Sequence, residues 1–80
     1  MPASVVEFNA SAIDVVVDSA SLRVSLADGR EISVPIEWFP RLRDATREQR
    51  NHWQLIGGGY GIHWEEIDED ISVPSLLRRN

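Results

Sequence analysis

Apolar and polar residues alternate in the first part of the chain. Residues 22–26 (LRVSL) alternate leucine or valine with arginine or serine, so one face of this segment is apolar, which is typical of a half-buried β-strand. A short β-branched run at residues 12–17 precedes it, and residues 31–34 follow it after an Asp28–Gly29 pair. Asp-Gly is a strong hairpin signal, because both central residues of a type I′ turn need positive φ. The pattern predicts three consecutive antiparallel strands.

The pattern after the third strand favours short helices. Pro35 suits a first helical turn, whereas Pro40 would interrupt an established helix, so residues 35–42 are expected to form only one or two turns. The sequence TREQ, which begins at Thr46, matches a capping box, in which two side chains bond each other's backbone amides. We predict a second short helix that starts there and ends near His52.

The last third of the chain predicts two more strands and a final helix. Residues 53–56 and 60–64 are expected to be strands, and the three glycines at residues 57–59 are expected to turn the chain between them. Ser72 is a suitable N-cap for a helix that ends at Arg79, where basic side chains meet the negative end of the helix dipole.

Together these elements predict one α+β domain covering residues 1–80. We expect a small antiparallel or mixed sheet of about five strands, in the order β-β-β-α-α-β-β-α, with the short helices packed on one face. A chain of 80 residues buries only about 60 to 65% of the surface that its unfolded form exposes, so its core is thin. Unpaired sheet edges are compatible with a homodimer, although charged side chains also blunt such edges.

Nearly the same pentapeptide occurs twice, as EISVP at residues 31–35 and as DISVP at residues 70–74. The flanking residues differ at once, which argues against an internal duplication. We interpret the motif as one structural device used in two places. Isoleucine and valine pack inward, the serine (Ser33 or Ser72) caps the following turn, and proline presets φ for that turn.

Composition indicates the cellular compartment in which the chain is expected. The chain has no cysteine, which removes disulfides, thiolate nucleophiles and cysteine-bound zinc, and fits a reducing cytoplasm. Residues 1–20 contain no basic side chain and so lack the charged region of a secretory signal. No apolar run approaches the roughly 18 residues of a membrane span. We expect a soluble cytoplasmic protein with no cofactor and no membrane partner.

Charge is unevenly distributed along the chain. Its net charge is −5, from thirteen acidic residues against eight basic ones, all of them arginine. The arginines of one group lie between residues 41 and 50: Arg41, Arg43, Arg47 and Arg50. The acids of a second group lie in the loop expected after the last strand: Glu65, Glu66, Asp68, Glu69 and Asp70. Either these are solvated faces that pair with each other or with water, or they meet a partner.

Motifs for catalysis, metal binding or nucleic acid binding are weak. The glycines at residues 57–59 lack the ending of a P-loop and precede no predicted helix, so we interpret them as a hairpin or bulge loop. His63 lies two residues before Glu65, and Asp68 and Asp70 can approach it, but no second close histidine completes a recognised ligand spacing. An acidic chain also repels nucleic acid phosphate on average. We expect the chain to have no enzymatic activity, and we do not expect it to bind nucleic acid by itself.

Aromatic residues gather in the second half of the chain. Trp64 and Phe39 are expected to lie in the core. Trp38 and Trp53 fit either the core or a partner-facing anchor, because tryptophan and arginine concentrate binding energy at interfaces. Trp38 lies close to the arginine group that starts at Arg41, so we expect an anchor there first.

Three ordered segments resemble a small bacterial family called domain of unknown function 2442. They are DGREISVPIEWFPRL at residues 28–42, ATxExRxxW at residues 45–53 and GxGIHWEEIDEDISVPSLL at residues 59–77. The resemblance covers roughly residues 12 to 78, and its last segment is the most specific. It implies a compact α+β domain and brings no catalytic residues.

The resemblance also implies a genetic context. Members often occur beside a second small protein, of the family called domain of unknown function 4160, in a layout that looks like a toxin and antitoxin pair. Our first hypothesis is therefore a non-enzymatic protein-binding domain, the antitoxin-like or accessory half of a two-gene module. The residues expected to meet the partner are Trp38, Arg41, Arg43, Trp53 and the acids Glu65, Glu66, Asp68, Glu69 and Asp70. The alternatives are a DNA-associated regulator that uses the Arg41–Arg50 patch and a small hydrolase or metal-dependent enzyme.

Overall fold

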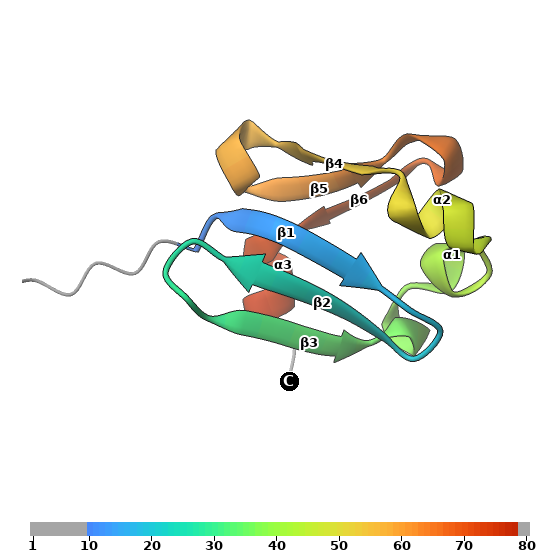
Figure 1. The fold of residues 1–80 in the computed structure, drawn as a ribbon, viewed down its shortest axis with the longest axis horizontal. Coiled ribbons are helices and arrows are strands. Elements are labelled where there is room, and N and C mark those ends of the chain that lie inside the picture. Colours follow the sequence, from blue (N-terminus) through green and yellow to red (C-terminus); the bar gives the residue numbers. More distant parts are fainter. Residues whose placement is uncertain (1–9, 79–80) are drawn as a thin grey trace, which may run out of the picture.

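The computed structural model describes residues 10–78, which form two three-stranded antiparallel sheets and short helices (Figure 1). The first sheet contains β1 (Ala12–Val17), β2 (Ser21–Leu26) and β3 (Glu31–Pro35), and the second contains β4 (Trp53–Ile56), β5 (Gly61–Trp64) and β6 (Glu69–Ser72). The α-helices are α1 (Pro40–Arg43), α2 (Arg47–Asn51) and α3 (Val73–Arg78). Single 3-10 turns form η1 (Ile36–Trp38), η2 (Gly57–Gly59) and η3 (Glu65–Ile67). None of the helices in this part of the chain is both long enough and apolar enough to cross a membrane.

The first sheet confirms the three predicted strands and their hairpins. Val24 in the middle of β2 pairs with Val15 on one side and with Ile32 on the other, so apolar residues share one face of the sheet. The hairpin after β2 closes where the Leu26 amide donates to the Arg30 carbonyl at 2.8 Å. A bulge near the start of β1 leaves Ile13 59% exposed.

The second sheet differs from the prediction. We expected about five strands in a single sheet and an acidic loop over residues 65–70, but six strands divide into two sheets. The extra strand, β6, contains one inward apolar residue, Ile71, which pairs with Ile62 of β5. An isolated isoleucine between acidic and polar residues gives no period-two signal, so β6 is recognisable only from its pairing with β5.

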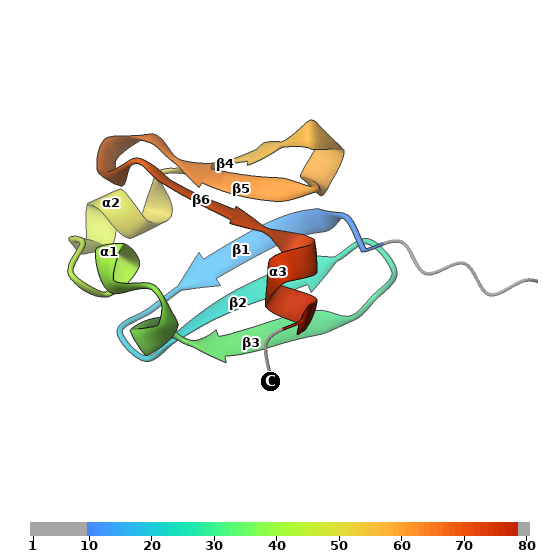
Figure 2. The same cartoon turned by 180° about the vertical axis from the view of Figure 1, so that it is seen from behind.

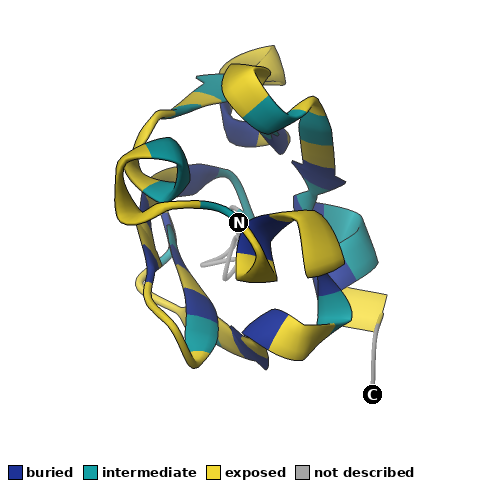
Figure 3. Cartoon of the chain, turned by 90° about the vertical axis from the view of Figure 1, so that its right-hand side faces the viewer, coloured by how far each residue is buried: buried dark blue, intermediate teal, exposed yellow. Residues whose placement is uncertain are grey.

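The core lies between the two sheets, which turn their apolar faces toward each other. In β2 every second residue is buried, and in β5 three of the four residues are buried (Figure 3). Trp64 is fully buried, and its indole nitrogen donates to the Arg50 carbonyl at 3.1 Å. Phe39 is buried as well, which confirms the expectation that both rings belong to the core.

The helices do not share one face of a sheet, which corrects the predicted layout. α1 and α2 sit together at one end, and α3 lies near β3 and β6 (Figures 1 and 2). The capping box of α2 is confirmed: the Thr46 hydroxyl accepts from the Gln49 amide at 3.1 Å, and the Gln49 side chain accepts from the Thr46 amide at 3.0 Å. The predicted end of the last helix, Arg79, lies outside the described residues.

The two pentapeptides both lead from a strand into a helical turn. In the second copy the Ser72 hydroxyl accepts from the Ser75 amide at 3.2 Å, as predicted. In the first copy the prediction is wrong, because Ser33 lies inside β3 opposite Arg23 and no side chain caps η1. The strand continues through Pro35 there, so the serine is too early in the sequence to reach the turn.

Candidate functional site

The outward side of the second sheet is a surface that no helix of residues 10–78 covers (Figures 1 and 2). Antiparallel pairing aligns two rows across its strands: Gln54, His63 and Asp70 form one row, and Ile56, Gly61 and Ser72 form the next. Apart from the buried Gly61, the residues of these rows are exposed or half-buried, whereas Ile62 and Ile71 of the inward row are buried and Leu55 is half-buried. We call this surface, with the adjacent Tyr60, the open face.

One end of the open face is apolar and hollow. Ile56 is 43% exposed and Tyr60 is 62% exposed, although both are large hydrophobic residues. They border a shallow concavity of about 390 Å³, whose floor includes Gly61 and whose rim includes Asp70. Exposed apolar side chains beside a hollow are typical of surfaces that bind other molecules.

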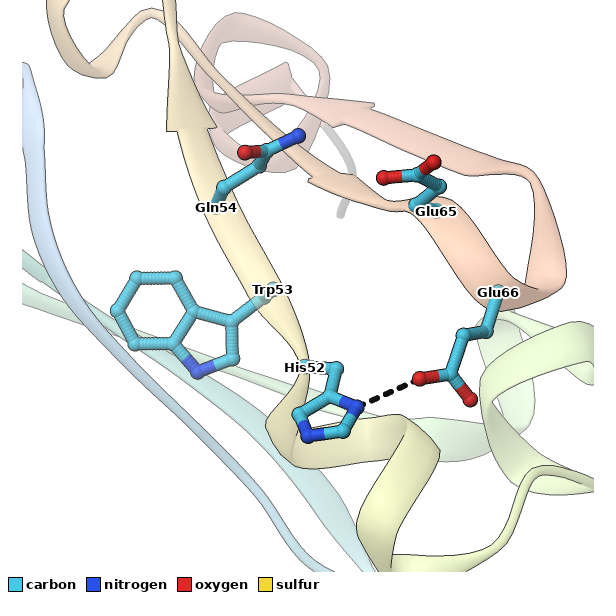
Figure 4. Close-up of a pocket in the computed structure, with 5 residues that line it drawn as sticks. All are labelled: His52, Trp53, Gln54, Glu65 and Glu66. Atoms are coloured by element: carbon cyan, nitrogen blue, oxygen red, sulfur yellow. Dashed lines mark hydrogen bonds and ion pairs between the residues drawn. The ribbon is translucent and has the colours of Figure 1, made fainter.

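The other end of the open face is acidic. A concavity of about 550 Å³ is lined there by His52, Trp53, Gln54, Glu65 and Glu66 (Figure 4). Nδ1 of His52 lies 2.6 Å from a carboxylate oxygen of Glu66. This hydrogen bond, together with the negative charge of Glu66, raises the pKa of His52 above its usual value. Between the two ends, the His63 ring contacts the Asp70 carboxylate.

The structure divides the five predicted acids between two surfaces. Asp70, Glu65 and Glu66 border the open face. Glu69 lies in the row of Trp53 and Trp64, on the inward side of the sheet, where partial burial raises its pKa while the charge of Arg41 acts in the opposite direction. Asp68 forms the turn before β6 in a left-handed conformation, with φ of 53°.

Three of the four predicted arginines make contacts within the chain. A guanidinium nitrogen of Arg41 donates to the Asp68 main-chain oxygen at 2.5 Å, which links α1 to the turn before β6. Arg43 contacts Asp44 at 2.9 Å. Arg50 donates at 2.9 Å to the carbonyl of Leu42, near the end of α1. These contacts give the arginines a structural role within the chain. Their role in binding a partner stays a prediction.

The two tryptophans proposed as anchors pack against the core. Trp38 and Trp53 are both partly buried and contact the buried cluster between the sheets. In Figure 4 the Trp53 ring extends toward β1, away from Glu65 and Glu66. Their role as partner anchors stays a prediction, and Ile56 and Tyr60 are the large side chains that stand on the open face. The sequence offered one signal for Tyr60, an aromatic residue directly after a glycine turn.

The groups that border the open face are carboxylates, the histidines that contact them and apolar carbon. Among residues 10–78, no three histidine, cysteine or acidic side chains gather closely enough to hold a metal ion. The contact of His63 is with Asp70, Glu65 lines the acidic concavity, and Asp68 lies in the turn before β6. The concavities are shallow, and their walls combine carboxylates with aliphatic and aromatic carbon. This mixture suits another protein's side chains.

Comparison with known proteins places the chain in a family. The sequence profile described as protein of unknown function (DUF2442) matches residues 12–80. The chain belongs to this family. The match contains every strand and helix of the DUF2442 domain described above, and it confirms the resemblance carried by the three sequence segments.

A solved structure supports the fold of this DUF2442 chain. The crystal structure of a protein of unknown function from Rhodospirillum rubrum ATCC 11170 is similar, with a TM-score of 0.72 and 33% sequence identity. The similarity covers 84% of this chain and 83% of that one. No curated protein matches the chain.

Proposed function

We propose that this chain is a non-enzymatic protein-binding domain, the antitoxin-like or accessory half of a two-gene bacterial module. The observation that supports it is the open face, where exposed Ile56 and Tyr60 lie near Asp70 at one end and Glu65 lies at the other. Protein interfaces combine such apolar centres with polar rims. Its partner would be a small protein, and the family called domain of unknown function 4160 supplies the first candidate.

The domain would act by covering a working surface of its partner. The net charge of −5 and the acidic end of the open face would attract a basic partner over distances near the Debye length, about 8 Å at physiological salt. Apolar contact at the other end would then hold the complex. Charge would therefore act mainly on the association rate, and apolar burial mainly on the lifetime of the complex.

Co-expression with the product of the neighbouring gene tests this function. We expect the two proteins to elute together in size-exclusion chromatography at micromolar concentration. Higher salt should slow their association, because the attraction between exposed charges is screened. Two separate peaks at micromolar concentration would contradict the proposal.

A further inference from the structure

We infer that the open face binds a cationic segment of a protein partner, with one apolar side chain in the hollow above Gly61 and basic side chains at the acidic end. This inference rests on the proposed function, because it assumes that the partner is a protein. It adds the binding surface and the chemistry of the partner segment.

The hollow lies beside a residue without a side chain, Gly61, and the backbone does not require glycine there. The preceding three glycines all have positive φ, which favours glycine, whereas Gly61 does not. A Cβ atom at Gly61 would lie 3.2 Å from the Ile56 Cγ1 atom, so the glycine lets the Ile56 side chain lie close against β5. The concavity that Ile56, Tyr60 and Gly61 line beside this contact is where a partner's apolar side chain can bind.

The strand geometry gives the spacing of the partner's side chains. Strands rise about 3.3 Å per residue, so the row of Gly61 lies about 7 Å from the row of His63 and Asp70. Glu65 follows two residues later, at about 13 Å from Gly61. An extended segment would meet these three levels with residues i, i+2 and i+4, the first apolar and the others basic.

The negative charge of the open face favours a basic binding partner. The Glu65 carboxylate, unlike its main-chain carbonyl, has no hydrogen bond or ion pair within the described residues, and it lines the acidic concavity with Glu66. A second copy of the chain would bring another net charge of −5 to this face, and nucleic acid would bring phosphates, so both meet repulsion. A segment rich in arginine or lysine complements the face.

A peptide titration of the full-length protein, labelled with ¹⁵N, tests the inference. The probe is a synthetic five-residue peptide with capped ends, leucine at its first position, arginine at its third and fifth positions, and serine between them. We expect its addition at millimolar concentration to shift the amide signals of Gly61, His63 and Asp70 in a heteronuclear correlation spectrum. Matched peptides with serine for leucine, or with glutamate for arginine, should cause much smaller shifts. Shifts confined to other surfaces, or no shifts, would overturn the inference.

Two pairs of variants locate the binding energy. Ile56→Ser should weaken peptide binding several-fold, whereas Val16→Ser, at a position with similar exposure (47% against 43%) on the other sheet, should not. Glu65→Gln should weaken it about two- to five-fold, as for an exposed charge pair, and the control Glu31→Gln on β3 should leave it unchanged. Equal effects within either pair would contradict the proposed surface.

Gly61→Ala tests the hollow directly. The added Cβ would displace the Ile56 side chain and change the shape of the hollow, which should reduce the affinity for the peptide about tenfold or more. The amide spectrum shows whether this variant is folded, and Ile56→Ser tests the same hollow if it is not. Unchanged affinity in a folded Gly61→Ala protein would overturn the inference.

Co-elution with the neighbouring gene product separates this inference from the proposed function. If all open-face variants still elute together with that protein, the proposed function stays intact and only this surface is rejected.

Discussion

Substitution of Gly59 provides the sharpest test of how the second sheet is held against the first. Gly59 is buried, its φ is +96°, and an added Cβ atom would lie only 2.6 Å from the Ala12 carbonyl oxygen of β1. Both the left-handed conformation and the contact disfavour any side chain. Gly58 is the matched control, because its φ is +67° but an added Cβ would meet no atom within 4 Å.

The two variants separate the cost of backbone strain at positive φ from the cost of a steric clash with β1. Gly58→Ala should cost about 1 kcal/mol, the usual penalty for placing alanine in the left-handed region. Gly59→Ala should cost that amount and about 1 to 3 kcal/mol more, because β1 must move away from η2. For a chain of 80 residues with a total stability of about 4 to 12 kcal/mol, a loss of this size is large.

Equilibrium unfolding in urea, followed by tryptophan fluorescence, measures both losses. The fully buried Trp64 should report the separation of the sheets. We expect a lower midpoint for Gly59→Ala than for Gly58→Ala at a similar slope. Equal midpoints for the two variants would refute the view that close approach to β1 explains the third glycine, and would reopen a binding role for the glycine turn.

Two further predictions concern side chains whose contacts the structure defines. Ser72→Ala should lower the free energy of unfolding by about 0.5 to 2 kcal/mol, whereas Ser33→Ala should change it by less than about 0.5 kcal/mol; similar losses in thermal unfolding would contradict the asymmetry. The pKa of His52, read from its ring protons by NMR, should lie above its usual value, about 6.5, and Glu66→Gln should bring it back. Because the folded-state pKa of His52 is raised, its contribution to stability should be fully present below about pH 6.5 and disappear as pH rises through the folded-state pKa. An unchanged pKa of His52 in the Glu66→Gln variant would contradict this pairing.

Local sequence rules predicted the elements whose signals lie within a few residues. Alternation and the Asp28–Gly29 pair gave the three strands of the first sheet, and the Thr46 capping box gave α2. Both depend on backbone preferences and on neighbours close in sequence. The same rules failed for Ser33, because whether a serine caps a turn depends on where the preceding strand stops.

The candidate site was predictable only in part. The acids at residues 65–70 were identified as a group, and three of them border the open face. Ile56 and Gly61 were not identified, since a four-residue strand with apolar residues on both sides does not show which side faces the core. The interpretation of the arginine group also changed from a partner-binding patch to one with structural contacts, because its long side chains reach main-chain oxygens such as that of Asp68.

The α+β class, the first sheet, the capped helix and the family of this protein follow from the sequence alone. The division of six strands between two sheets, the inward packing of Trp53 and the alignment of outward residues across β4, β5 and β6 are visible only in the folded chain. This difference comes from the range of the interactions. Turn and cap preferences act within about four residues, whereas β6 gains its hydrogen bonds from β5, and Trp53 gains its burial from contacts between two sheets that only the folded chain brings together.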